Sequence, residues 1–312
     1  MKTVKNYLSL VKFSHTIFAM PFALIGFFLA ARDPIKNWFS SFSNDRITQD
    51  FILDHNRAVF VDSPLWVKFL LVMACMVTAR SAAMAFNRYL DRHFDSQNPR
   101  TAIREIPAGI ISANSALLFT MLNCSVFVIA TFFINKICFF LSPVALFVIL
   151  FYSYTKRFTP LCHLVLGLGL SLAPIGAYIA VTGVFHLLPL FFSFAVLFWV
   201  SGFDIIYALQ DEAFDRSQQL YSIPVAVGTA KALRISEVLH LLSGACVIAA
   251  GIFGQFGWLY WVAVAIFCVM LIYQHSIVKP NDLRRVNLAF MTANGIASVV
   301  FAVFVIADLM VN

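Results

Sequence analysis

Long apolar runs separated by short polar segments dominate the chain and predict its helices. A helix that crosses the hydrocarbon core of a bilayer needs about 20 predominantly apolar residues. Measured against that length, the sequence predicts about nine spanning helices. They cover residues 14–32, 66–88, 114–134, 137–154, 163–183, 188–209, 232–251, 257–277 and 287–309. We therefore expect an all-α polytopic membrane protein that forms a single domain over residues 1–312.

The connections between the spans differ in length and charge. Residues 33–63 form the longest connection; they hold several aspartates without strong periodicity and predict an extramembrane loop. Most of the 22 Lys and Arg residues lie in the alternate connections that share a side with the N-terminus. By the positive-inside rule, that side is cytoplasmic.

Composition supports a membrane protein and argues against a nucleic-acid-binding one. The chain is 61% hydrophobic and 12% charged, whereas soluble domains are about 45–50% apolar and about 25% charged. The net charge of +7 comes from basic residues scattered over short loops rather than gathered on one soluble face. All six cysteines lie inside apolar runs without a CxxC pair, which is typical of small buried side chains rather than of disulfides or a metal site. Small residues of the span at 163–183, such as Gly167, predict close helix packing.

Two acidic clusters follow apolar runs on the predicted cytoplasmic side. On a continuous α-helix, Asp204, Asp211 and Asp215 would fall within roughly 40° of one another, and Tyr207 would border the same stripe. A second cluster has the spacing i, i+4, i+8 and comprises Asn87, Asp91 and Asp95. Mg²⁺ prefers oxygen ligands and is commonly shared between carboxylates and a phosphate-bearing substrate, so the two clusters predict a magnesium site.

Basic residues stand beside these clusters. Arg100, Thr101 and Arg104 follow Asp95 in the next connection. Guanidinium groups bind phosphate oxygens in a bidentate fork, so carboxylates followed by arginines suit a diphosphate. The alternative is an ordinary solvated loop, but two acidic helix ends on one side are hard to explain by solubility alone.

Lys156 and Arg157 end the fourth span, where the positive-inside rule alone accounts for them. Their position also lets them reach a diphosphate or an aromatic carboxylate. Asp204 lies deeper than Asp211, and a carboxylate within the bilayer is costly unless it is paired or faces a polar cavity. Arg80 lies on the same helical face as Asn87, and an ion pair between Asp204 and Arg80 is an alternative to a functional role.

With both clusters in view, the chain resembles the UbiA superfamily of intramembrane aromatic prenyltransferases, and most closely its branch that acts on 4-hydroxybenzoate-like acids. The family motif NDxxDxxxD appears as NRYLDRHFD, which carries over Asn87, Asp91 and Asp95. Arg88 replaces the first aspartate of that motif and leaves one ligand fewer. The motif DxxxD matches Asp211 and Asp215. Three further family motifs also match. YDxIYAxxD appears as FDIIYALQD and includes Asp204. RTxxRxxPxG matches Arg100, Thr101, Arg104, Pro107 and Gly109, and TKR matches Lys156 and Arg157.

The resemblance implies a bundle of nine helices around a central cavity in a bacterial inner membrane. It implies a polyprenyl diphosphate bridged by Mg²⁺ and held by Arg100, Arg104 and Lys156, with a small aromatic acid as acceptor. Asp204 would orient the phenol or help to remove a proton, and Arg157 would contact the acceptor carboxylate. Further substrate contacts are expected from Asn87, Arg80, Tyr207 and Thr101.

Two alternatives stay open. Within the same enzyme class, the acceptor could be a naphthoate of menaquinone synthesis or, less closely, haem. From another class, a secondary transporter would bind a coupling cation near the bilayer midplane and would have inverted repeats and broken helices. Most acidic residues here lie at helix ends beside arginines, which favours the transferase.

Overall fold

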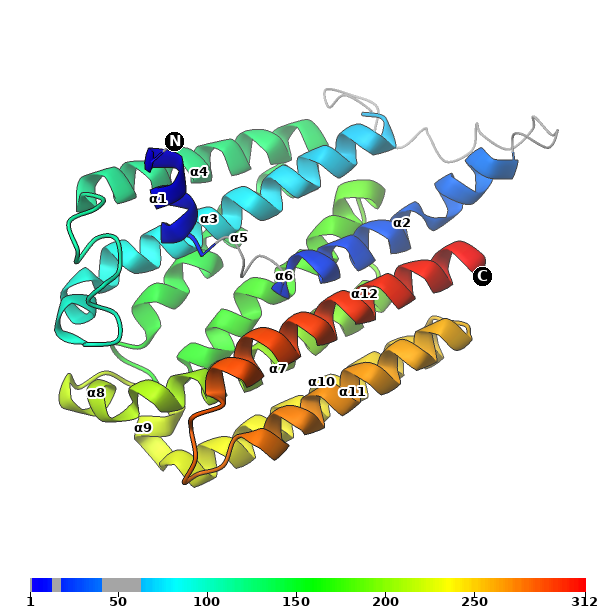
Figure 1. The fold of residues 1–312 in the computed structure, drawn as a ribbon. Coiled ribbons are helices and arrows are strands. Elements are labelled where there is room, and N and C mark those ends of the chain that lie inside the picture. The colour runs from blue at the N-terminus through cyan, green and yellow to red at the C-terminus, as the bar shows by residue number, and fades with distance from the viewer. Residues whose placement is uncertain (1, 13–17, 41–62) are drawn as a thin grey trace.

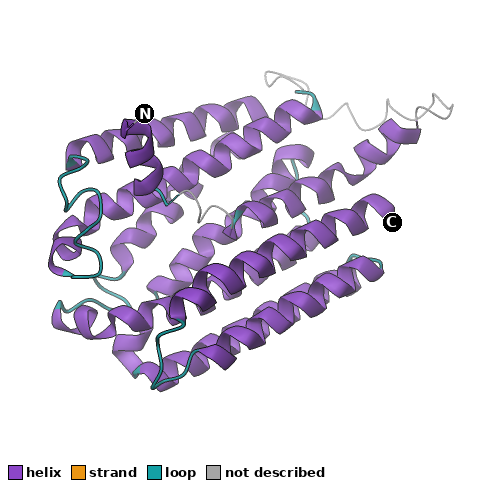
Figure 2. Cartoon of the chain, in the orientation of Figure 1, coloured by secondary structure: helices purple, strands orange, loops and turns teal. Residues whose placement is uncertain are grey.

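The structure of this chain is a computed structural model, and it describes residues 2–12, 18–40 and 63–312. Long helices pack side by side with roughly parallel axes in one bundle (Figure 1). Figure 2 shows helices and loops only over these ranges, without a strand. The all-α prediction is therefore confirmed.

Eight helices of the described ranges are long and apolar enough to cross a membrane. The eight spans correspond to α3 (Leu65–Gln97), α4 (Ala113–Ile134), α5 (Lys136–Thr155), α6 (Cys162–Thr182), α7 (Leu187–Ala208), α10 (Thr229–Phe253), α11 (Trp258–Ile277) and α12 (Asn294–Val311). The first predicted span corresponds to α2 (Met20–Ser40), whose apolar part, Met20–Arg32, is shorter. The prediction of a multi-pass membrane protein with about nine spans agrees with this arrangement.

Short elements connect or flank the long helices. They are α1 (Lys2–Leu10), the 3₁₀ turn η2 (Leu209–Asp211), α8 (Glu212–Ser217), α9 (Ile223–Val227) and the π-helix η3 (Leu288–Ala293). Helix α1 lies across the bundle, beside α3 and α4 (Figure 1). In the connection predicted at 33–63, α2 continues to Ser40, and residues 41–62 lie outside the described ranges.

Glycines let α6 approach its neighbours closely. A Cβ on Gly167 would collide with the carbonyl oxygen of Leu197 and the hydroxyl of Ser201, both on α7. A Cβ on Gly26 of α2 would collide with the carbonyl of Pro174 on α6. Small residues allow backbones to pack at short range within a membrane. The prediction of close packing for this span is therefore confirmed at Gly167, whereas a Cβ on Gly176 would have nothing within 4 Å.

The helices of the C-terminal half enclose an aromatic core with a small polar centre. Phe22, Trp199 and Phe301 are fully buried in it. The side-chain oxygen of Asn294 accepts hydrogen bonds from Trp199 Nε1 at 2.8 Å and from Gln274 Nε2 at 2.7 Å. Buried polar groups in a membrane protein need such partners, because lipid offers none. Asn294 directly follows the π-helix and ties it to α7 and α11.

Candidate active site

The last turns of α3 present the first acidic cluster to one end of the bundle. Asp91 is 3% exposed and pairs with two cations of the α5 end, Lys156 Nζ at 2.7 Å and Arg157 Nη2 at 2.9 Å. Asn87 donates to Asp91 Oδ2 at 3.2 Å. The spacing i, i+4 on a helix places Asn87 and Asp91 on one face, as the sequence predicts.

Asp95 lies one turn further on and is held by arginines. Its Oδ1 accepts a hydrogen bond from Arg104 Nη1 at 2.6 Å, and its Oδ2 lies 4.0 Å from Arg88 Nη1. Thr101 donates its hydroxyl proton to the Asp95 carbonyl at 3.1 Å. Arg88, the residue that departs from the family motif, is 5% exposed, and its Nε has no hydrogen-bond partner among the described residues.

The second acidic cluster is not on one uninterrupted α-helix. Helix α7 ends at Ala208, the turn at Leu209–Asp211 is 3₁₀, and α8 follows. Each residue of a 3₁₀ helix turns the chain by about 120° around the axis, against about 100° in an α-helix. Three such residues together rotate the following segment by roughly 60° relative to a continuous α-helix. The stripe of Asp204, Asp211 and Asp215 is therefore wider than a constant period of 3.6 residues predicts, but all three side chains line one cavity.

Arg100 joins the two clusters. Its Nε donates to Asp211 Oδ1 at 2.9 Å, its Nη2 pairs with Oδ2 of the same carboxylate, and its Nη1 donates to Tyr207 Oη at 2.8 Å. Asn98 adds a hydrogen bond to Asp211 at 3.2 Å. Burial works to lower the pKa of the Arg100 guanidinium, but the bonds to Asp211 and the charges of Asp211 and Tyr207 outweigh it and raise that pKa.

Both clusters line one small polar cavity of about 170 Å³, which we call the polar cavity. Asp215 faces it from α8, and its carboxylate makes no hydrogen bond or ion pair within the part of the chain that the structure describes. The predicted site residues that line the polar cavity are Asn87, Asp91, Asp95, Arg100, Thr101, Arg104, Lys156, Asp204, Tyr207, Asp211 and Asp215. The folded chain thus brings together residues from four separate stretches of sequence.

A larger cavity of about 630 Å³, the apolar cavity, extends from there between α3, α4, α5, α6 and α7. Its walls are mostly aliphatic and aromatic. Six residues line both cavities: Asn87, Arg100, Arg104, Tyr152, Asp204 and Tyr207. The two cavities therefore adjoin, with charged groups at one end and hydrocarbon along the rest.

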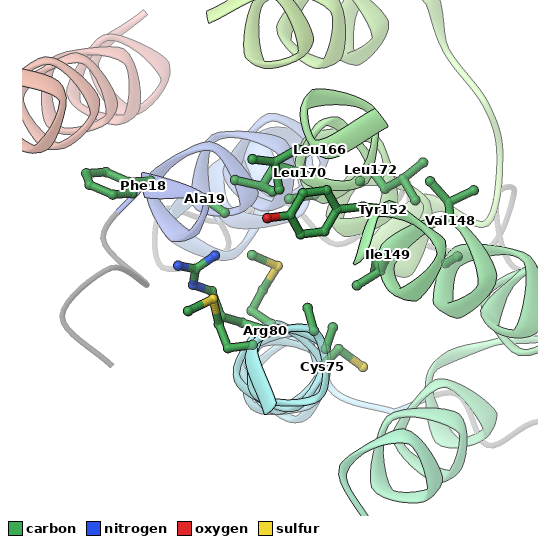
Figure 3. A pocket seen from close by; sticks show the side chains of 18 of the residues that line it. Phe18, Ala19, Cys75, Arg80, Val148, Ile149, Tyr152, Leu166, Leu170 and Leu172 are labelled. Carbon is green, nitrogen blue, oxygen red and sulfur yellow. The ribbon is translucent and has the colours of Figure 1, made fainter. Parts of the chain in front are cut away.

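Arg80 and Tyr152 project into the apolar cavity from α3 and α5 (Figure 3). Arg80 makes no hydrogen bond or ion pair with the described residues, and its Nε is buried without a partner. The alternative of an Asp204–Arg80 ion pair is wrong, because Asp204 Oδ2 contacts His163 Nδ1 at 2.7 Å instead. Tyr152 escaped the sequence analysis, although it stands one helical turn before Lys156 on the same face.

Arg157 does not line either cavity. It lies behind Asp91, where it also donates to the backbone oxygens of Ser153 at 2.6 Å and Leu90 at 3.2 Å. His163, which sequence reasoning left as an interface histidine, is 3% exposed and lines the polar cavity.

The donor atoms of the polar cavity suit a hard divalent cation. They are carboxylate and amide oxygens from Asn87, Asp91, Asp211 and Asp215, the ligand types that Mg²⁺ prefers. Among the described residues, no three His, Cys, Asp or Glu side chains already stand at ligand distance of one another. Arg100 and Lys156 instead neutralise the carboxylates, and cations in this position can pair with an incoming diphosphate.

The fold and this site define a multi-pass α-helical membrane protein with an acidic and basic polar cavity at the end of a long apolar one. The sequence pattern of the UbiA prenyltransferase family matches residues 59–296, and the chain belongs to that family. It is thus an enzyme that transfers prenyl groups, which excludes the transporter alternative.

Named relatives and solved structures agree with this membership. A 4-hydroxybenzoate octaprenyltransferase of Nitrosomonas europaea is 31% identical over 228 residues, which is 72% of this chain and 77% of the relative. One of Nitrosospira multiformis is 29% identical over 226 residues, 72% of this chain and 78% of the relative.

An apo UbiA homolog from Aeropyrum pernix superposes with a TM-score of 0.73 at 27% identity, covering 95% of this chain and 97% of that one. A UbiA homolog from Archaeoglobus fulgidus, bound to DMAPP and Mg²⁺, has the same fold with a TM-score of 0.68 at 18% identity, covering 98% and 100%.

Proposed function

We propose that the chain transfers a polyprenyl group from polyprenyl diphosphate to the ring of a 4-hydroxybenzoate-like acid in respiratory quinone biosynthesis, with Mg²⁺ as the cofactor. The observation that carries the proposal is the junction of the polar cavity with an apolar cavity of about 630 Å³. A diphosphate fits the first and an isoprenoid tail fits the second. The names of the relatives support the aromatic acid as acceptor.

The basic residues of the polar cavity would bind the diphosphate. Arg100, Arg104 and Lys156 are each paired with an aspartate in this structure, so each can exchange a carboxylate oxygen for a phosphate oxygen. Mg²⁺ held by Asn87, Asp91, Asp211 and Asp215 would neutralise charge on the leaving diphosphate. Asp95 was predicted as a further ligand; its contacts with Arg104 and Arg88 favour a role in orienting those arginines.

Arg80 is our candidate for the carboxylate of the acceptor, in place of Arg157. Arg80 has no hydrogen-bond or ion-pair partner in the part of the chain that the structure describes. A guanidinium in an apolar wall is costly unless an anion pairs with it. Arg157 already bonds Asp91 and two backbone oxygens, so we assign it to holding Asp91.

Transfer requires an electron-rich ring near the allylic carbon. Tyr207 lines both cavities, and Phe203 and Phe290 line the apolar cavity. The faces of these rings can stabilise an allylic cation. Asp204 lines both cavities and would accept the proton of the phenol as the ring attacks ortho to the hydroxyl.

An assay with membranes tests the proposal. Membranes that contain the chain are incubated with Mg²⁺, a labelled polyprenyl diphosphate and a panel of aromatic acids that includes 4-hydroxybenzoate and a dihydroxynaphthoate. We expect an EDTA-sensitive prenylated acid, absent with Asp211→Asn and retained with Asp282→Asn. Asp282 is a matched control because it pairs only with Arg284 on the surface. If only the naphthoate is prenylated, the acceptor is a naphthoate rather than a 4-hydroxybenzoate-like acid. If none of the acids is prenylated, the proposal is overturned.

A further inference from the structure

His163, which is buried, and Asp204, which is partly buried, form a pair between α6 and α7. The His163 side chain is 3% exposed, and the Asp204 side chain is 20% exposed. Nδ1 of His163 lies 2.7 Å from Oδ2 of Asp204. A short contact between buried polar groups is worth more than one in water and holds both side chains in a fixed orientation.

The backbone of α9 determines which ring nitrogen carries the proton. The amide of Ile223 lies 3.3 Å from His163 Nε2 and can only donate, so Nε2 accepts. The neutral ring then has its proton on Nδ1, which donates it to Asp204. The hydrogen bond therefore holds the Asp204 carboxylate in one orientation.

The other oxygen of Asp204 stays available to a substrate. Oδ1 receives no hydrogen bond from the described residues, and Asp204 is among the six residues that line both cavities. Any phenol that enters the junction of the cavities meets this oxygen, with its orientation set from behind by the imidazole.

We infer that His163 is a positioning residue that fixes the orientation of the Asp204 carboxylate, so that it can take the phenol proton of the acceptor. This inference rests on the proposed function. As the carbon–carbon bond forms, the bond from the prenyl carbon to the diphosphate oxygen breaks and its electron pair leaves with the diphosphate. The phenol proton moves to Asp204 Oδ1. When the ring regains aromaticity, Asp204 returns that proton to the oxygen and the displaced ring proton leaves with the diphosphate.

Three substitutions of His163 separate its two hydrogen bonds. The side-chain amide of His163→Asn can donate near the position of Nδ1 but does not reach Ile223. His163→Gln reaches Ile223 near the position of Nε2 instead, and His163→Ala loses both bonds. We expect His163→Ala to lower kcat roughly ten- to a hundred-fold, a part of what acid–base catalysis supplies. The KM for polyprenyl diphosphate should change little, because the His163 side chain makes its hydrogen bonds to Asp204 and Ile223 and not to Arg100, Arg104 or Lys156.

The pattern among the variants distinguishes positioning from packing. We expect His163→Asn to recover most of the lost kcat and His163→Gln to stay as slow as His163→Ala. A ring-fluorinated acceptor, whose phenol ionises more readily, should reduce the defect of His163→Ala. Combined with Asp204→Asn, His163→Ala should add little further loss, because the two residues act as one unit.

The same experiment distinguishes a failure of the role of His163 from a failure of the proposed function. Each variant is first purified in detergent and its Tm measured, and the kinetic comparison uses variants that stay folded. A wild-type chain without aromatic product overturns the proposed function. Two results with an active wild type would overturn the role of His163 and leave the proposed function intact. One is that His163→Asn is no faster than His163→Ala. The other is that ring fluorination of the acceptor leaves the defect of His163→Ala unchanged.

Discussion

At the scale of single residues, cations in the site hold the carboxylates in place. Asp91 is paired with Lys156 and Arg157, and Asp211 with Arg100. Breaking a buried pair by removing one partner leaves an uncompensated charge, which costs about 3–5 kcal/mol. If a diphosphate and Mg²⁺ bind as proposed, this cost would be avoided. A phosphate oxygen would pair with each cation, and the metal would pair with each carboxylate.

Arg80 provides a prediction at this scale. If Arg80 binds the acceptor carboxylate, Arg80→Ala should raise the KM for the acid roughly ten- to a hundred-fold, since a hydrogen bond to a charged group contributes about 1.5–3 kcal/mol. The KM for polyprenyl diphosphate should change little. The comparison is with an acceptor in which a neutral amide replaces the carboxylate. A loss of equal size for the amide and the acid would contradict the assignment.

At the scale of elements, the position of α6 against α7 determines the site. His163 and Gly167 are one turn apart on α6, so the close approach at Gly167 also brings His163 to Asp204. The 3₁₀ turn at the end of α7 leads into α8, and Asp211 and Asp215 line the polar cavity together with Asp204. A 3₁₀ turn between helices often marks a functional segment.

Two glycines of α6 form a matched pair for testing this packing. Gly167→Ala should destabilise the protein by about 1–3 kcal/mol, because its Cβ meets the backbone of α7. Gly176→Ala on the same helix has nothing within 4 Å of its Cβ and should be neutral or stabilising by up to about 1 kcal/mol. Thermal unfolding in detergent compares them, and equal Tm values for the two variants would argue against a close contact at Gly167.

At the scale of the whole molecule, both acidic clusters lie at one end of the bundle, the end that also carries the α1–α3 contact (Figure 1). The uneven distribution of Lys and Arg between loops favours the cytoplasm for this end. A cytoplasmic polar cavity would give a charged diphosphate access without crossing the bilayer.

Cysteine labelling tests that orientation. In a background without the six native cysteines, Val184→Cys at the far end of α6 should react in intact cells with a maleimide that cannot cross the membrane. Asp282→Cys, in the connection between α11 and α12, should react only after permeabilisation. Val184 is 53% exposed, and the side chain of Asp282 is 36% exposed, so burial does not limit access of the maleimide to either position. The reverse labelling pattern would place the site outside.

The sequence by itself determined the class of fold and the chemical inventory of the site. Hydrocarbon thickness sets the length of an apolar run, and motif spacing at i, i+4 places Asn87 and Asp91 on one face whatever the rest of the chain does. Only the tertiary structure decided the pairings. The Arg100–Asp211, Lys156–Asp91 and His163–Asp204 contacts join residues distant in sequence, and such contacts depend on helix packing that no local pattern encodes. For the same reason the sequence left an Asp204–Arg80 ion pair open as an alternative, whereas in the structure Asp204 contacts His163.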